Sequence, residues 1–151
     1  MMRRFFPQIQ DPYQLYELGQ EKERTYREMY RPHIREVHGL TSFLQAIQSK
    51  GIIGLLATMG DQPNIDFTLD SLGIRSYFSF TTGGHEVSKG KPDPEIFLLS
   101  MQKAGLRPEE CLVIEDSLNG LKAAKEAGMS VWIVPNRVTA CLDFSPADRV
   151  F

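Results

Sequence analysis

The sequence has little of what secreted, membrane-spanning or nucleic-acid-binding proteins require. Only two of its 151 residues are cysteines, and Cys111 and Cys141 fit neither a metal-binding spacing nor a disulfide framework. No apolar run approaches the ~20 residues of a membrane helix, and the first one stops at Pro7, too early for a signal peptide. The formal net charge of −2 implies no broad attraction to nucleic acid or anionic membranes. These absences predict a cytoplasmic protein with no nucleic-acid and no membrane partner.

Two common nucleotide-binding motifs are also absent. The basic segment at residues 89–91 follows two glycines, but a P-loop requires G-x-x-x-x-G-K-[ST], and position 92 is proline. No G-x-G-x-x-G follows an apolar strand, so dinucleotide binding has no support. The histidines at positions 33, 38 and 85 have no ligand spacing, which favours surface or core roles over a metal site.

Short apolar runs alternate with amphipathic segments along the chain. The run over residues 52–58 lacks the period-two pattern of a half-exposed strand, which is typical of a parallel strand covered on both faces. The runs over residues 111–114 and 131–134 are expected to be buried strands. We predict strands over residues 52–58, 77–81, 111–114, 131–134 and 148–151, and helices over residues 11–31, 41–49, 63–72, 93–104 and 118–127. This order predicts an α/β fold with a mainly parallel sheet.

Polar residues stand where three of these elements end or begin. Thr58 ends a predicted strand, Lys91 precedes a predicted helix, and Glu115 and Asp116 end another strand. In a parallel sheet these positions open on one edge, where ligands bind. Taken singly, each residue is better explained as a strand end, a surface lysine or a helix-capping acid. Their joint order and placement favour a common site.

The chemistry of this set suits a phosphoryl group. Thr58 and the backbone N–H groups of Met59 and Gly60 can donate hydrogen bonds to phosphate oxygens. Lys91 neutralises negative charge on those oxygens. The two adjacent carboxylates are suited to a hard cation such as Mg²⁺. The sequence therefore predicts a magnesium-assisted phosphate site.

The segments that carry these residues resemble the haloacid dehalogenase superfamily, in particular its β-phosphoglucomutase-like phosphatases. The resemblance rests on Thr58, on residues 90–97 and 113–120, and on the small residues at 123–124 and 127–129. It implies that Thr58 is the phosphate-binding hydroxyl and that Lys91 is the catalytic, phosphate-orienting lysine. It further implies that Glu115 and Asp116 are the magnesium-site acids.

The resemblance also implies a domain organisation. Residues 1–38 are expected to be part of a helical cap with its hinge, and residues 39–151 an incomplete Rossmann-like α/β core with helices on both faces of its sheet.

One family motif is missing from the sequence. The family's nucleophile is the first Asp of a D-x-D-G motif on the central strand, and this chain contains no D-x-D. Without that Asp there is no covalent phospho-enzyme route. Loss of the central strand would expose two inner edges. Three compensations are conceivable: direct pairing of the neighbouring strands, insertion of residues 2–6, or dimerisation through the exposed edges.

Two functions follow as alternatives. The first is a Mg²⁺-dependent phosphatase or sugar-phosphate mutase, represented here by its C-terminal part and inactive alone. Its substrate would be a small phosphomonoester such as a sugar phosphate, and Mg²⁺ binding would be weak or absent. The second is a non-catalytic phosphate-binding or interaction protein derived from such a hydrolase.

Overall fold

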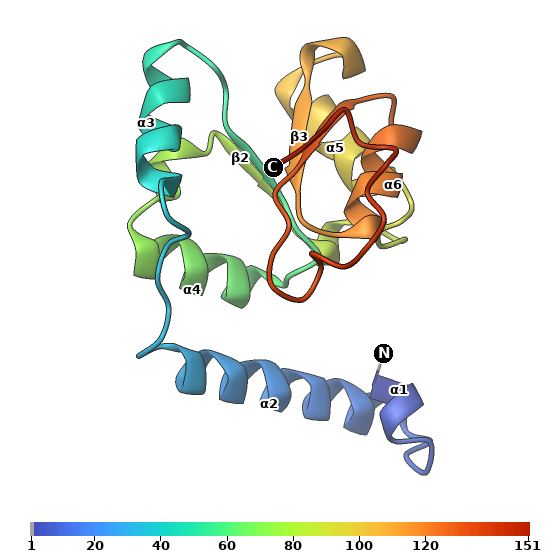
Figure 1. Ribbon diagram of the computed structural model, residues 1–151. Coiled ribbons are helices and arrows are strands. Elements are labelled where there is room, and N and C mark those ends of the chain that lie inside the picture. The colour runs from blue at the N-terminus through green and yellow to red at the C-terminus, as the bar shows by residue number, and fades with distance from the viewer. Residues whose placement is uncertain (1) are drawn as a thin grey trace.

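The apolar runs of the chain form short parallel strands, and the amphipathic segments between them form helices (Figure 1). The computed structural model describes residues 2–151. The helices are α1 (Met2–Phe5), α2 (Pro12–Tyr30), α3 (Leu40–Ser49), α4 (Gln62–Leu72), α5 (Glu95–Ala104) and α6 (Leu118–Glu126). The strands are β1 (Leu55–Ala57), β2 (Phe80–Thr82), β3 (Leu112–Glu115), β4 (Ser130–Ile133) and β5 (Arg149–Val150). The predicted α/β class with parallel strands is confirmed.

The strands form two separate sheets. β1 pairs with β2 in parallel, with Leu56 opposite Thr81. β4 lies between β3 and β5, with Val113 opposite Val131 and Ile133 opposite Val150, all in parallel. Each sheet therefore ends in a strand, β1 or β3, that has a partner on one side only within the part of the chain that the structure describes.

Two apolar cores hold the helices to the strands. One lies between α5, α6 and one face of β3 and β4, and it contains the fully buried Ile96, Leu121 and Val131. The other packs α3 and α4 together through Leu44 and Leu69, with Leu56 of β1 against it. Ala57, the next residue of β1, packs on the first core instead. Helices therefore cover both faces of the β1–β2 sheet.

The second sheet is covered on one face only. Val113 of β3 is buried against α5 and α6, whereas Leu112 and Ile114, which point to the other face, are 45% and 46% exposed. The expectation of a buried strand over residues 111–114 is therefore wrong for one face of β3. An apolar run shows that a strand can be buried, but the covering element must be supplied by the rest of the fold.

Several predicted boundaries are wrong at the first sheet. β1 occupies only residues 55–57 of the predicted 52–58, and Ile52 and Ile53 are half exposed. β2 begins at Phe80 because residues 75–77 form a 3-10 turn. A strand extends only as far as a partner satisfies its backbone groups. Because β2 spans only residues 80–82, the β1–β2 ladder is short.

None of the intramolecular compensations for a missing central strand is observed. β1 and β3 do not pair with each other within residues 2–151. Residues 2–5 form helix α1, which packs on α2 and adds no strand to either sheet. Direct strand pairing and insertion of residues 2–6 are thus wrong, and dimerisation stays a prediction.

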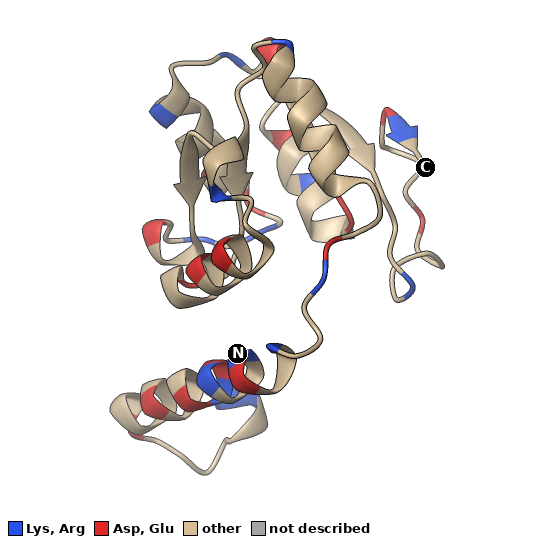
Figure 2. Cartoon of the chain, turned by 90° about the vertical axis from the view of Figure 1, so that its left-hand side faces the viewer, with Lys and Arg blue, Asp and Glu red and all other residues tan. Residues whose placement is uncertain are grey.

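Helix α2 lies apart from the two sheets and contacts the rest of the fold through α4 (Figures 1 and 2). Asp11 caps its N-terminus by accepting the N–H of Tyr13 at 2.9 Å. Acidic and basic side chains alternate along it, and Leu15 alone among its residues is buried. Most of the charged side chains of α2 are thus exposed, and so are large apolar side chains such as Tyr13, Tyr16 and Met29.

Residues 2–151 were searched for membrane spans, and no helix there combines the length and the apolar character that crossing a bilayer requires.

Candidate active site

Lys91 joins the ends of the two sheets. Its ammonium group donates to the carbonyl oxygen of Ala57, the last residue of β1, at 3.2 Å. The same group forms an ion pair with Glu115, the last residue of β3. The Lys91 and Glu115 side chains are only 11% and 10% exposed. The structure therefore brings three of the predicted site segments, which are distant in sequence, to one point.

The loop before α5 positions Lys91. The Glu95 carboxylate accepts the backbone N–H groups of Ser88 at 2.9 Å and Lys89 at 2.8 Å, which closes the loop. These hydrogen bonds hold the pKa of the Glu95 carboxyl below its usual range. The Lys91 ammonium lies 4.6 Å from the ring centroid of Phe97 on α5. By contrast, the Lys89 side chain is 73% exposed.

The loop also departs from one prediction. Asp93 and Pro94 were expected to begin the helix, but α5 begins at Glu95. The Asp93 carboxylate still accepts the backbone N–H of Glu95 at 3.1 Å, so it satisfies one donor of the first helical turn.

Thr58 lies directly after β1, beside the Ala57 carbonyl that Lys91 contacts. The backbone N–H of Thr58 donates to the carbonyl of Thr82 at 3.0 Å, which extends the β1–β2 ladder by one bond. The Thr58 hydroxyl accepts the N–H of Gly60 at 3.2 Å. The predicted phosphate-binding groups at residues 58–60 therefore form a tight turn next to the Lys91 ammonium.

Glycines allow this turn to pack closely. A Cβ atom on Gly84 would lie 2.6 Å from the carbonyl oxygen of Met59, closer than real Cβ contacts. Gly84 also donates its N–H to the carbonyl of Gly60 at 3.1 Å. Asp61 then caps α4 by accepting the N–H of Asn64 at 3.1 Å. The backbone at Met59 and Gly60 is thus fixed from both sides.

Glu115 and Asp116 are adjacent in sequence but differ in their surroundings. The Glu115 carboxylate is tied to Lys91 and also accepts the hydroxyl of Ser117 at 3.1 Å. It lies over Gly120, where any Cβ atom would overlap the carboxyl group. Asp116 is exposed and accepts the side-chain amide of Asn136 at 2.7 Å.

Asn136 is a site residue that the sequence analysis missed. Its side-chain oxygen accepts the N–H groups of Val138 at 2.8 Å and Thr139 at 3.1 Å, which leaves its NH₂ group to face Asp116. Asn136 follows β4 at the same end as Asp116 follows β3. A polar residue after a predicted strand was therefore the available signal.

The two carboxylates do not complete a magnesium site by themselves. Mg²⁺ requires near-octahedral oxygen coordination, and within residues 2–151 no three His, Cys, Asp or Glu side chains converge on a point. Glu115 is already paired with Lys91, so Asp116 offers the freer carboxylate. The residues of this chain can contribute to a Mg²⁺ shell but do not form one.

Helix α2 reaches this region through a second missed residue, Asn64 in the first turn of α4. The Asn64 side chain accepts from Arg27 at 2.8 Å and donates to Glu23 at 2.8 Å. Arg27 and Glu23 lie one turn apart on α2. Both contacts come from residues more than 35 positions away, and no sequence pattern pairs them.

Comparisons with known proteins agree with this geometry. Residues 7–128 match the family model described as haloacid dehalogenase-like hydrolase. The chain is 37% identical over 110 residues to the phosphorylated carbohydrates phosphatase of Thermotoga maritima, covering 73% of this chain and 49% of that protein.

Solved structures of phosphate-handling proteins also match this chain. CbbY from Rhodobacter sphaeroides in complex with phosphate matches with a TM-score of 0.87 and 25% identity, covering 98% of this chain and 69% of that one. A β-phosphoglucomutase from Clostridium difficile matches with a TM-score of 0.82 and 26% identity, covering 93% and 61%. The chain spans about half the length of the curated relatives it matches.

Proposed function

Because the chain belongs to the haloacid dehalogenase-like hydrolases, we propose that it forms the phosphate-binding part of a Mg²⁺-dependent phosphatase or sugar-phosphate mutase. The observation that carries this proposal is the contact of Lys91 with both Ala57 and Glu115. It gathers the ends of β1 and β3 and the Thr58 turn around one buried cation.

The residues of the chain would act together on a phosphoryl group. The Thr58 hydroxyl and the N–H groups of Met59 and Gly60 bind its oxygens. The Lys91 ammonium compensates the charge that develops on those oxygens, and Glu115 holds Lys91 in place. Asp116, oriented by Asn136, and Glu115 contribute to a weak Mg²⁺ site. When bound, Mg²⁺ would withdraw charge from the transferring group.

The 151 residues are expected to lack turnover of their own. The sequence has no D-x-D, and none of its site residues can attack phosphorus to form a phospho-enzyme. The gap between β1 and β3 is where a further strand would join the two sheets. We place the missing nucleophile on such a strand.

One relative supports the proposed substrate class. The Thermotoga maritima protein is named for phosphorylated carbohydrates, which supports a small phosphomonoester such as a sugar phosphate. We also propose that residues 1–38 are the last part of a cap with its hinge, that residues 39–151 are the core, and that the protein works in the cytoplasm.

Turnover of an aryl phosphate with Mg²⁺ tests this function. The chain alone should stay near the uncatalysed rate, and a version extended by a D-x-D-G strand and a full cap should turn over at an enzyme-like rate. In the extended version, Lys91→Ala should lower kcat/KM by at least ~100-fold, whereas the matched Lys89→Ala should change it little. Equal turnover by both versions, lost in Lys91→Ala of the short chain, would show that the nucleophile is misplaced.

The alternative is a non-catalytic phosphate-binding protein, and the missing D-x-D favours it. Inorganic phosphate should then shift the amide signals of Met59 and Gly60 in the chain as it stands. The extended version distinguishes this alternative from the first function. If that version folds but does not turn over the aryl phosphate, the non-catalytic binding role is supported.

A further inference from the structure

Asn64, in the first turn of α4, joins helix α2 to the core of the fold. Its side-chain oxygen accepts a hydrogen bond from Arg27 at 2.8 Å, and its NH₂ group donates to Glu23 at 2.8 Å. Within residues 2–151, no other side-chain hydrogen bond connects α2 with α4. Both the oxygen and the nitrogen of this one amide are therefore engaged by α2.

The other side of Asn64 faces the turn at residues 58–60. Its backbone N–H donates at 3.1 Å to the carboxylate of Asp61, the residue directly after Gly60. A Cβ atom on Gly60 would lie 3.5 Å from the Thr58 hydroxyl and 3.8 Å from the Cβ atom of Asn64, which are ordinary contact distances. Gly60 therefore packs between Thr58 and Asn64, and the position of Asn64 limits where the Gly60 backbone can lie.

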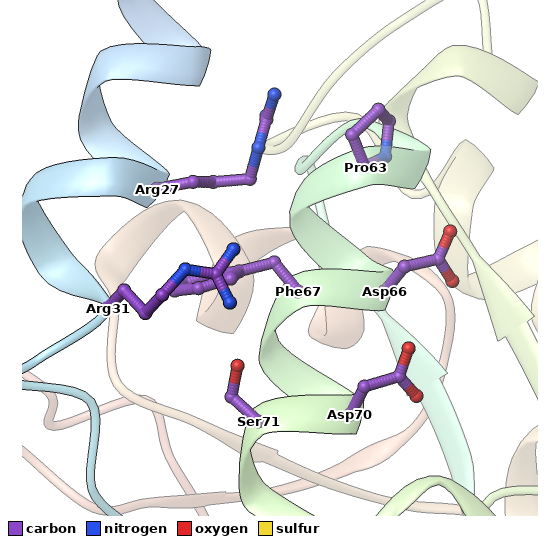
Figure 3. Close-up of a pocket in the computed structure, with 7 residues that line it drawn as sticks. All are labelled: Arg27, Arg31, Pro63, Asp66, Phe67, Asp70 and Ser71. Atoms are coloured by element: carbon purple, nitrogen blue, oxygen red, sulfur yellow. The ribbon is translucent and has the colours of Figure 1, made fainter.

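The α2 partners of Asn64 are less exposed than most charged residues of this helix. Glu23 is 27% exposed, and it also pairs with Lys22. The Lys22 ammonium and the Asn64 amide hold the pKa of the Glu23 carboxyl below its usual range. Figure 3 shows the Arg27 side chain directed toward the start of α4, where Pro63 lies. Asn64 thus receives a charged donor on one side and a charged acceptor on the other, and such hydrogen bonds are strong.

We propose that Asn64 is a positioning residue, which couples the docking of α2 on α4 to the binding of a phosphate oxyanion at residues 58–60. The inference rests on the proposed function, because the oxyanion is the one assigned to this turn. Arg27 and Glu23 hold the Asn64 side chain, and Asn64 holds the Gly60 backbone, whose N–H binds phosphate. Such a coupling is reciprocal: a bound oxyanion favours the docking of α2 by the same factor by which docked α2 favours the oxyanion.

The first test titrates the full chain with inorganic phosphate. The double variant Glu23→Ala/Arg27→Ala removes both α2 partners of Asn64, leaves the net charge unchanged and introduces a good helix former. The Kd for phosphate, read from the backbone amide signal of Gly60 by ¹H–¹⁵N correlation spectroscopy, should rise at least ~5-fold. The matched control Glu21→Ala/Arg24→Ala removes an exposed ion pair of the same charges from α2 and should leave the Kd unchanged.

A cycle with Asn64→Ala tests whether both effects pass through the same side chain. Asn64→Ala alone should raise the Kd as much as Glu23→Ala/Arg27→Ala does, and the triple variant should raise it no further. Independent, additive effects would overturn the proposal, and so would an Asn64→Ala effect that the α2 double variant does not reproduce.

The reciprocal effect is measured at Asn64 itself. Saturating phosphate should slow the exchange of the Asn64 side-chain NH₂ protons with solvent, compared with sodium chloride at equal ionic strength. The NH₂ group of Gln20, which is exposed on α2, corrects for any direct effect of phosphate on exchange. A purely structural role of Asn64 would leave its exchange independent of phosphate, which would contradict the coupling.

A measurement without ligand separates this proposal from the proposed function. The N–H of Gly84 donates to the carbonyl of Gly60 at 3.1 Å, so its exchange reports on opening of the turn. Glu23→Ala/Arg27→Ala should speed this exchange, whereas Glu21→Ala/Arg24→Ala should not. If phosphate fails to shift Gly60 in the unmodified chain, the proposed function fails at this turn, and the Gly84 exchange still decides whether α2 positions it. Unchanged Gly84 exchange in the first variant overturns the positioning role of Asn64 whether or not phosphate binds.

Discussion

The ammonium of Lys91 and the carboxylate of Glu115 form a nearly buried ion pair between two sheets that share no backbone hydrogen bond within residues 2–151. Lys91 comes from the loop before α5, and Glu115 ends β3. The pair therefore has two roles. It holds the cation of the candidate site, and it ties the end of β3 to the end of β1 through the Ala57 carbonyl.

Removal of the lysine should destabilise the fold. Lys91→Met leaves the Glu115 carboxylate buried without its partner, and we expect a loss of about 3 kcal/mol in the free energy of unfolding. The double variant Lys91→Met/Glu115→Gln should recover part of this loss, because no uncompensated charge remains. Urea denaturation measures both.

The matched control is Lys89→Met, two residues away. Lys89 is 73% exposed and lies 3.5 Å from Asp93, so its replacement should change stability by less than about 0.5 kcal/mol. If Lys91→Met lowered the free energy of unfolding as little as Lys89→Met, the ion pair would contribute nothing to joining the sheets.

Gly120 should respond to substitution through Glu115. Alanine in a helix is usually stabilising over glycine by about 1 kcal/mol, but here the added methyl group would overlap the Glu115 carboxyl group. Gly120→Ala should therefore destabilise the chain and weaken phosphate-induced shifts at Gly60.

A double-mutant cycle isolates that effect. In a Glu115→Ala background the overlap is gone, so Gly120→Ala should become neutral or stabilising. Equal destabilisation of Gly120→Ala in both backgrounds, measured by thermal unfolding, would place the steric conflict elsewhere.

The sequence predicted where helices begin and end better than it predicted which side chains are buried. The bounds of α2, α3 and α4 lie within one residue of their predicted bounds, and Asp11, Asp61 and Ser117, residue types that favour N-caps, cap three of the helices. The exposure of Ile114 could not be predicted, because the strand itself looks the same whether or not a helix covers its second face. Burial depends on elements that another part of the fold must provide.

The sequence likewise predicted some residues of the candidate site and missed others. Thr58, Lys91, Glu115 and Asp116 could be picked out because each stands where an element ends or begins. Asn136 also stands after a predicted strand, but its partner Asp116 lies 20 positions away. Asn64 carries no such signal, because its role arises from hydrogen bonds to residues more than 35 positions away. The sequence analysis assigned Glu115 only to a magnesium site. Its ion pair with Lys91 could be seen only in the structure.

Acid should loosen the loop that presents Lys91. The backbone N–H groups of Ser88 and Lys89 lower the pKa of the Glu95 carboxyl from its ordinary 4.5. A carboxyl whose pKa is lower in the folded state contributes stability that is full above 4.5 and lost as pH falls through the lowered pKa. Glu95→Gln should thus lower the Tm by a few degrees at pH 7, and the difference from the unmodified chain should shrink below pH 4.5.

The control for that pH dependence is Glu126→Gln on α6. Glu126 is exposed and, within residues 2–151, forms no ion pair. Its replacement should leave the Tm within a degree or so across the pH range. A Glu95→Gln deficit that stays constant from pH 7 to pH 3 would mean that the loop does not depend on the ionised carboxylate.

The open sheet edges should make the chain self-associate. β1 and β3 each present unpaired backbone groups on one side, and Leu112 and Ile114 add a half-exposed apolar face beside them. Such edges are templates for pairing with another chain. Sedimentation velocity at increasing protein concentration should therefore show a dimer. Ile114→Lys should shift the equilibrium toward the monomer, because a charge on that face cannot be buried without cost.

Two controls decide what causes the association. Val138→Lys alters a large apolar side chain that is 82% exposed in the loop after β4, and it should leave the dimer intact. Extension of the chain by a D-x-D-G strand should abolish association, since that strand would pair with both edges and cover the gap. A chain that stays monomeric at every concentration, or that dimerises equally well after the extension, would show that β1 and β3 are protected in another way. In that case the gap between the sheets would not be a site of strand pairing, and the strand that we propose as the carrier of the nucleophile would have to approach Lys91 from a different direction.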